Sequence, residues 1–198
     1  MHKNNFAVFI ALITLTFSAI SHASVSDSVV TVFADETPVG SAVAVTKSLL
    51  ATNCRVAMSS ANLQVKVSDI LTPVSLFYAD KEHNLCFLKD AGSDFDSVYI
   101  KPSKTISLDD VIYVIGNPEG YWRTNYKGSL TGRATVSGNP VLITNANIST
   151  QSSGGGAFDS SGNLIGITFI ANYEGRRTVL VIPSEILIDY LSSHPQDR

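Results

Sequence analysis

The chain has 198 residues, of which 44% are hydrophobic and 16% are charged. This balance is that of a globular protein, so the composition excludes a disordered chain and a collagen-like repeat. The 14 basic residues face 17 acidic ones, and no basic excess or polybasic run points to nucleic acid or to an anionic membrane surface. Two cysteines are too few for a disulfide scaffold or a four-cysteine zinc site. The length allows one domain or two small ones that share an interface.

Residues 1–23 have the three parts of a secretory signal peptide. A short positive region precedes an uncharged apolar run over 6–20, and the small residues Ser21 and Ala23 stand before a cleavage point. The apolar run is shorter than the roughly 20 residues that span a bilayer. An uncleaved anchor or a buried helix is the alternative. We therefore expect an exported protein, periplasmic or secreted, whose mature part 24–198 keeps no stable membrane anchor.

The expected cleavage also narrows the inventory of reactive side chains. It removes two of the four histidines and leaves His83 and His194. It places Cys54 and Cys86 in an oxidising compartment, where a disulfide is favoured over free thiols.

The mature chain reads as a succession of short strands separated by turn residues. The predicted strands are 29–34, 41–46, 49–52, 62–67, 72–79, 85–89, 111–115, 126–131, 133–137, 141–145, 155–158, 164–171 and 178–182. One helix is predicted over Ser184–Ser193, because Pro183 precedes it and apolar residues recur at helical spacing. Its buried side is predicted to hold Ile186, Leu187, Tyr190 and Leu191.

About thirteen strands and a terminal helix indicate an all-β fold. Two packed antiparallel β-barrels of six to seven strands each fit this count, and a large sandwich is the alternative. Gly, Ser, Asp, Pro and Lys cluster over 91–107, which favours a boundary there. The first barrel is then expected over about 28–92 and the second over about 107–182, followed by the helix at about 184–193.

Ser153 stands directly before three consecutive glycines, and this is the strongest local signal in the chain. Glycine runs are costly in backbone entropy, so the turn is expected to need close backbone approach or a positive φ. A serine on such a turn, beside converging N–H groups, has the geometry of a nucleophile with an oxyanion hole. A flexible Ser/Gly loop is the alternative that this stretch alone leaves open.

Six segments in chain order carry a family resemblance. They are 40–43 (GSAV), 51–56 (ATNCRV), 82–89 (EHNLCFLK), 115–120 (IGNPEG), 152–159 with 164–167 (SSGGGAFD, LIGI), and 181–183 (VIP). On these motifs the chain resembles the trypsin-like serine peptidases, particularly the bacterial exported branch, over nearly the whole mature chain. The resemblance implies two antiparallel barrels, and a peptide-bond hydrolase that uses serine, histidine and aspartate.

Two of the three catalytic positions implied by the resemblance hold other residues. Ser153 is at the nucleophile position, Arg55 is at the base position and Asn84 is at the position that orients the base. A guanidinium offers hydrogen-bond donors only and stays protonated, so Arg55 cannot act as a general base. Asn84 is neutral and cannot stabilise an imidazolium.

The resemblance also assigns an oxyanion hole and a disulfide. The hole would use the N–H groups of Gln151 and Ser153, and the family usually has glycine at the first position. Because a non-glycine residue at positive φ costs roughly 1 kcal/mol or more, the peptide at Gln151 can flip and leave the hole unformed. Toleration of the strain is the alternative. The segments that hold Cys54 and Cys86 face each other in the family fold, so these two residues are expected to pair.

Other residues are candidates for a base or for a binding surface. His83 is expected on an outward loop, His194 lies beyond the helix, and nothing places a lysine beside Ser153. Two cysteines and one nearby histidine fall short of a metal site, and no cofactor is expected. An aromatic cluster either lines a binding groove or packs at a barrel edge. That cluster is Tyr121, Trp122 and Tyr126, with Arg123 and Lys127 beside it.

The sequence therefore favours an exported, catalytically inactive peptidase homologue that holds a peptide or protein ligand in the cleft between the barrels. Strand addition is the expected binding mode. Arg55 would place a fixed positive charge beside Ser153, where an anionic group or a chain terminus can dock. The alternatives are an active serine endopeptidase that uses Ser153 with a non-standard base, and a secreted partner protein that uses only its outer surface.

Overall fold

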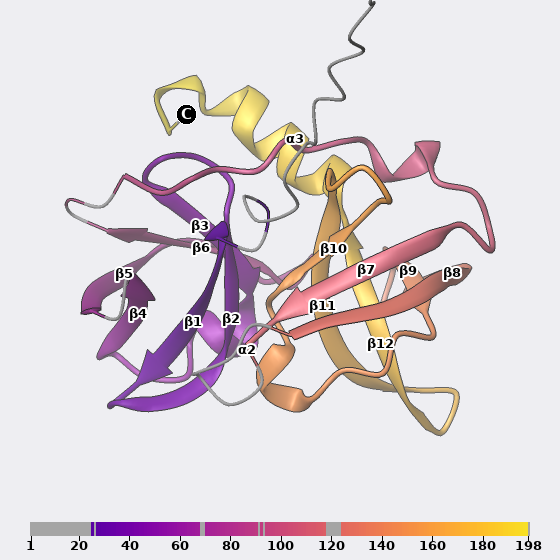
Figure 1. Ribbon diagram of the computed structural model, residues 1–198, viewed down its shortest axis with the longest axis horizontal. Helices are drawn as coiled ribbons and strands as arrows, with labels where there is room; N and C mark the ends of the chain where they lie inside the picture. The colour runs from indigo at the N-terminus through magenta and orange to yellow at the C-terminus, as the bar shows by residue number, and fades with distance from the viewer. Residues whose placement is uncertain are drawn as a thin grey trace, which may run out of the picture.

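The computed structural model describes residues 25, 27–67, 70–90, 92, 94–117 and 124–197. The expected signal peptide, 1–23, lies outside these residues. Two β-barrels stand side by side, and the C-terminal helix lies across the top of both in Figure 1. This arrangement confirms the predicted all-β fold and excludes the single large sandwich.

The first barrel closes in the strand order β1-β2-β3-β6-β5-β4, with every pairing antiparallel. A one-turn helix, α2 (Cys54–Ala57), leaves the end of β3 on the side that faces the second barrel. The strands are β1 (Val29–Ala34), β2 (Thr37–Ala44), β3 (Leu49–Asn53), β4 (Leu63–Val67), β5 (Ile70–Asp80) and β6 (Leu85–Asp90).

The second barrel repeats the antiparallel architecture in the order β10-β11-β12-β9-β8-β7. Its last strand runs directly into the C-terminal helix α3 (Ser184–Ser193). The strands are β7 (Val111–Gly116), β8 (Thr124–Val136), β9 (Asn139–Thr144), β10 (Gly156–Phe158), β11 (Leu164–Tyr173) and β12 (Arg176–Pro183). The described residues also form the 3₁₀ turns η1 (Ser103–Thr105), η2 (Thr150–Ser152) and η3 (Pro195–Asp197).

One pair of predicted strands is a single strand in the structure. Ranges 126–131 and 133–137 were predicted as separate strands, but they form the single strand β8. The register of β8 against β9 shifts between Leu130 and Gly132. A bulge at this position bends the strand without ending it, so Gly132 marks a bend and not a turn. Each barrel therefore has six strands.

Helix α3 begins and ends at the predicted residues, and its buried side differs in one position. Leu187, Tyr190 and Leu191 are buried, whereas Ile186 is only partly buried against the same cluster. The side chains of α3 cover a hydrophobic cluster that joins the two barrels, with Phe87 from the first and Phe158 from the second. The helix therefore holds the barrels together on one side and leaves the opposite side for the candidate site (Figure 1).

Within the described residues, no helix has the length and apolar character needed to span a bilayer.

Candidate active site

Ser153 lies on a tight turn between η2 and β10. Its backbone N–H donates to Thr150 O at 3.1 Å. Gly154 follows with φ of +89°, and a Cβ at Gly154 would collide with Ser41 O and Thr52 Oγ1. Only glycine fits there, which explains one glycine of the run after Ser153.

The first barrel supplies hydrogen bonds to both ends of Ser153, which is only 1% exposed. Ser41 N of β2 donates to Ser153 O at 2.9 Å. Asn53 Nδ2, at the end of β3, donates to Ser153 Oγ at 2.9 Å. The hydroxyl at the nucleophile position is therefore held by an amide donor and shielded from solvent.

Asn53 is also the N-cap of α2. Its Oδ1 accepts from Val56 N at 3.1 Å, and asparagine is among the preferred residues at this position. Sequence reasoning missed the role of Asn53 beside Ser153. Asparagine is a common N-cap residue, but α2 was not among the predicted elements. Nothing in the sequence indicates that Asn53 contacts the second barrel.

Arg55, in α2, reaches across the junction between the barrels. Its Nη2 donates to Val39 O of β2 and to Thr150 O at the start of η2, each at 3.4 Å. Both bonds are long compared with the usual range of about 2.7–3.2 Å. Partial burial lowers the pKa of the Arg55 guanidinium. Among the described residues, no carboxylate forms an ion pair with Arg55.

Asn84 lies at the start of β6 in the left-handed region, with φ of +58°. Its Oδ1 and its backbone carbonyl both accept from Cys54 N, each at 3.2 Å. Asparagine tolerates this backbone conformation better than most residues. Asn84 therefore fixes the start of α2, and no hydrogen bond in the described part of the chain joins it to the Arg55 side chain.

Side chains of the second barrel support the η2 turn. Ser149 Oγ accepts from Ser152 N at 3.3 Å and lies 3.1 Å from Ser152 Oγ. Ser152 Oγ donates in turn to Tyr126 Oη at 3.4 Å. Because Ser152 is fully buried, these contacts help to hold the carbonyl of Thr150 toward Ser153 N and Arg55.

A family model described as a trypsin-like peptidase domain matches residues 40–167, about two thirds of the chain. The chain belongs to this family. The matched range contains Arg55, Asn84 and Ser153.

Solved structures of trypsin-like proteases share the fold. The HtrA-type protease AlgW, solved with a tripeptide, is 25% identical with a TM-score of 0.76, over 88% of this chain and 63% of AlgW. The MamO protease domain from Magnetospirillum magneticum is 18% identical with a TM-score of 0.71, over 85% of this chain and 97% of that domain. Anti-sigma-I factor RsgI9 from Acetivibrio thermocellus is 27% identical over 161 residues, which are 78% of this chain. The match spans only 23% of RsgI9, so the similarity concerns one part of that protein.

The oxyanion hole predicted from the sequence uses the N–H groups of Gln151 and Ser153. The N–H of Ser153 is already bonded to Thr150 O, and Gln151 is not among the residues with positive φ. The carbonyl of Gln151 accepts from Ser41 Oγ at 3.2 Å. In this structure the two N–H groups therefore do not form an open pair of donors.

The structure contains the expected disulfide between Cys54 and Cys86, with the two Cα atoms 4.9 Å apart. Cys54 directly precedes Arg55, and Cys86 follows Asn84 by two residues. The bridge thus ties α2 to β6 beside both altered positions.

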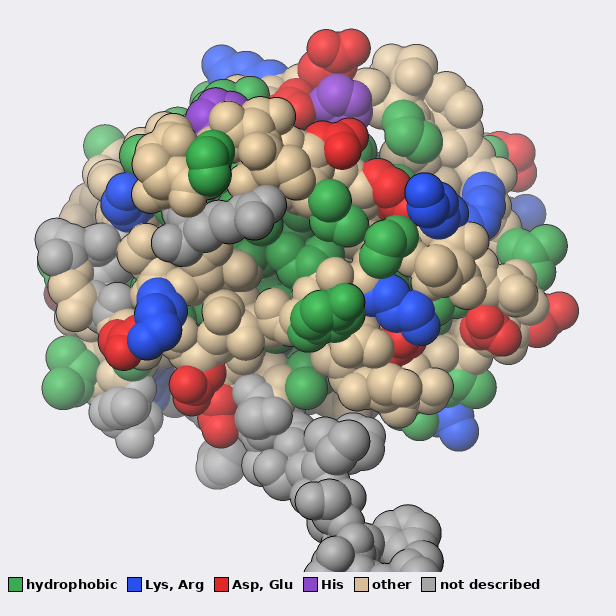
Figure 2. All heavy atoms as spheres, turned by 90° about the horizontal axis from the view of Figure 1, so that it is seen from above, with side chains coloured by type: hydrophobic (Ala, Val, Ile, Leu, Met, Phe, Trp, Pro, Cys, Tyr) green, Lys and Arg blue, Asp and Glu red, His purple; other side chains and the backbone are tan. Residues whose placement is uncertain are grey.

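His83 and His194 line one pocket, away from Ser153. His83 Nδ1 lies 2.7 Å from Asp80 Oδ2, and the ring of His194 stacks on Tyr190 at 4.4 Å. Both line a pocket of about 280 Å³ between β5, β6 and α3. Figure 2 shows histidine and acidic side chains together on the face that carries α3. Neither ring hydrogen-bonds to Ser153, so neither is placed as its base.

The predicted aromatic cluster lies only partly within the described residues. Tyr121, Trp122 and Arg123 lie outside the described residues. Tyr126 is partly buried in β8, with its hydroxyl against Ser152, so it supports the η2 turn. Lys127 is exposed on the same strand.

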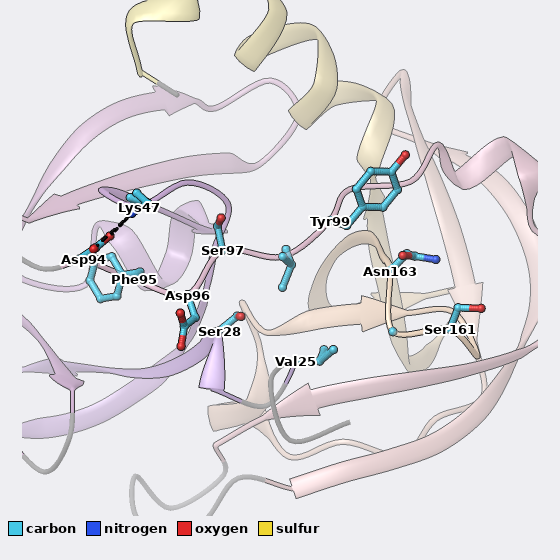
Figure 3. A pocket seen from close by; sticks show the side chains of 12 residues that line it. Val25, Ser28, Lys47, Asp94, Phe95, Asp96, Ser97, Tyr99, Ser161 and Asn163 are labelled. Carbon is cyan, nitrogen blue, oxygen red and sulfur yellow. Dashed lines mark hydrogen bonds and ion pairs between the residues drawn. The ribbon is translucent and has the colours of Figure 1, made fainter. Parts of the chain in front are cut away.

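A larger pocket, of about 570 Å³, lies where the inter-barrel connection passes the β10–β11 turn. Figure 3 shows the ion pair of Lys47 and Asp94 at one end and Tyr99 and Asn163 at the other. The lining includes none of the predicted catalytic residues Arg55, Asn84 and Ser153, so this pocket is separate from the candidate site. In the described part of the chain, no group of His, Cys, Asp and Glu could hold a metal ion.

Proposed function

We propose that this trypsin-like domain is an exported protein that binds peptides or proteins between its barrels and does not cleave them. The observation that carries the proposal is the Arg55 guanidinium, which donates to Thr150 O where a peptidase needs a proton acceptor. Ser153 Oγ accepts a hydrogen bond from the Asn53 amide, which cannot take up a proton either.

The size of the expected loss supports inactivity. Removal of the base from a serine peptidase lowers turnover on the order of 10⁶-fold, and exchange of the orienting aspartate for asparagine lowers it roughly 10⁴-fold. This chain carries changes of both kinds, at Arg55 and Asn84. The N–H of Ser153 is also bonded within the turn, so a tetrahedral intermediate would first have to displace Thr150 O.

Binding remains chemically available because the two-barrel scaffold is intact. Extended peptides can add to strand edges through backbone hydrogen bonds, which need no catalytic group. The disulfide between Cys54 and Cys86 supports export, since such bonds persist in oxidising compartments.

The test uses the mature protein, purified from an oxidising compartment, with casein and a fluorogenic peptide library as substrates. We expect no hydrolysis above that of the Ser153→Ala variant, and no rapid labelling of Ser153 by a fluorophosphonate probe. Robust wild-type hydrolysis that Ser153→Ala abolishes would overturn the proposal and favour a peptidase with an unidentified base. Binding is tested separately by amide chemical shifts on titration with short peptides, and shifts confined to surfaces outside the inter-barrel cleft would contradict it.

A further inference from the structure

Arg55 lies exposed at the junction of the barrels, and it forms no ion pair with a carboxylate of the described residues. Its two acceptors are backbone carbonyls, both at 3.4 Å, and no described carboxylate pairs with it. Neutral carbonyls compensate a guanidinium less well than an anion does. An anion at this position would therefore be a stronger partner for Arg55 than either carbonyl is.

The carbonyl oxygen of Thr150 marks the position that such a ligand can take. Arg55 Nη2 and Ser153 N both donate to this one oxygen, at 3.4 and 3.1 Å. One donor comes from the first barrel and the other from the second. An oxygen of a bound anion at the same place would accept from both.

We propose that Arg55 and the amide of Ser153 bind the C-terminal carboxylate of a peptide, whose oxygen displaces that of Thr150. Rotation of the peptide between Thr150 and Gln151 would move the carbonyl away and turn Gln151 N–H toward the carboxylate. This assignment rests on the proposed function, because it names the ligand of the same site.

The geometry favours a chain end over a continuing chain. Arg55 donates to Val39 of β2 on one side and to Thr150 beside η2 on the other, so its side chain bridges the two barrels. A peptide that enters along the second barrel meets this bridge next to Ser153. A chain that ends there presents two oxygens, which match the planar donor fork of arginine. An uncharged scissile carbonyl offers only one.

The experiment records amide chemical shifts of the ¹⁵N-labelled mature protein. The probes are acetyl-trialanine with a free carboxylate, the same peptide as the C-terminal amide, and acetyl-Ala-Ala-Asp amide, which has only a side-chain carboxylate. We expect saturable shifts of Gln151 and Ser153 with the first probe. Its affinity should exceed that of each of the other two by about tenfold or more, the size of a charge-assisted hydrogen bond.

Two variants show whether the effect belongs to Arg55. Arg55→Gln should lower the affinity for the free carboxylate about tenfold, and Arg55→Lys should restore part of it. Arg177→Gln is the matched control, since Arg177 also donates a guanidinium N–H to a backbone carbonyl, Ile148 O, at 2.9 Å. That control should bind as the wild type does.

Three outcomes would overturn the inference. Equal affinity for the free and amidated peptides would leave peptide binding intact but remove the role of the carboxylate. Equal affinity for the side-chain carboxylate would remove the preference for a chain end. If Arg55→Gln gave a well-dispersed spectrum and bound the free carboxylate as tightly as the wild type does, Arg55 would not be the partner of the carboxylate. The proposed function fails by a different result, namely hydrolysis that depends on Ser153.

Discussion

Asn53 Nδ2 donates to Ser153 Oγ at 2.9 Å, across one hundred residues of sequence and across the junction of the two barrels. The same side chain caps α2 through Val56 N. One buried amide therefore connects the start of the helix that carries Arg55 to the hydroxyl at the nucleophile position. The two contacts can be separated by mutation.

Asn53→Ala removes the cap and the Nδ2 bonds to Ser153 Oγ and Thr168 O, whereas Asn53→Ser removes only the Nδ2 bonds. Serine caps helices about as well as asparagine does, but it is too short to reach Ser153. We expect Asn53→Ala to lower the free energy of unfolding by about 1 kcal/mol more than Asn53→Ser, measured by urea denaturation. Equal losses in the two variants would show that the cap contributes nothing.

The general architecture was accessible from the sequence, but the local geometry of the site was not. Alternating apolar runs and turn residues placed most strands within a few residues, because burial on one face follows local periodicity. The two segments of β8 were separated at Gly132, although β9 pairs with β8 on both sides of the bulge. Propensity is weaker than this long-range pairing.

The residues of the candidate site could be predicted from sequence motifs, but the contacts between them could not. Ser153, Arg55 and Asn84 were found because each lies within a linear motif. The contact of Asn53 with Ser153, and the shared acceptor Thr150 O, depend on how two barrels dock. Docking is set by the common hydrophobic cluster under α3, which no local pattern describes.

Stepwise restoration of the catalytic positions should recover activity non-additively. Arg55→His alone should do little, since the imidazole would lack a charged orienting group. Arg55→His with Asn84→Asp should recover part of the rate, and adding Gln151→Gly should recover more, because glycine can adopt the positive φ that opens the N–H groups. The triple variant should exceed the wild type by at least about 10³-fold, within the roughly 10⁶-fold that a complete unit contributes.

Fluorogenic-peptide hydrolysis measures each step of this series. The triple variant with Ser153→Ala is the control and should be inactive. If Arg55→His alone matched the triple variant, the orienting group and the flipped peptide would have no part in the inactivity.

Gly154 and Gly138 form a matched pair for the cost of a side chain on the nucleophile turn. Their φ angles are +89° and +88°, but a Cβ at Gly154 would collide with Ser41 O and Thr52 Oγ1, whereas Gly138 has open space. Gly138→Ala should cost about 1–2 kcal/mol, the price of the left-handed conformation. Gly154→Ala should cost about 1–3 kcal/mol more, because it also overpacks a buried site. Urea denaturation of both variants measures the loss in free energy of unfolding. Equal losses would contradict the predicted collision with Ser41 O and Thr52 Oγ1.

Asp159 should make the stability of the fold depend on acid pH. Burial alone raises the pKa of this carboxyl, but hydrogen bonds from Lys101, Asn163 and Ser161 outweigh burial and lower the pKa overall. Because the folded pKa lies below the unfolded one, the stabilisation is complete above the unfolded value of about 3.9 and is lost as pH falls through the folded pKa.

The corresponding variant is Asp159→Asn. At pH 6 it should be about 1–2 kcal/mol less stable than the wild type, and this difference should shrink as the pH falls below about 4. Asp94→Asn is the control, since the pair of Asp94 with Lys47 is exposed and should contribute little at either pH. A difference between Asp159→Asn and wild type that stays constant from pH 6 to pH 2 would contradict the assignment.

The disulfide between Cys54 and Cys86 should be the largest single covalent contribution to stability. It closes a separation of 32 residues, which corresponds to about 4 kcal/mol in the chain-entropy model. The Cys54→Ala/Cys86→Ala variant and the reduced wild type should lose the same amount in urea denaturation. Intact mass should fall by two hydrogen atoms in protein from an oxidising compartment relative to reduced protein. Two free thiols in that preparation would contradict the bridge. Because Cys54 adjoins Arg55, the double variant should also bind acetyl-trialanine more weakly than the wild type, as α2 loses its tie to β6.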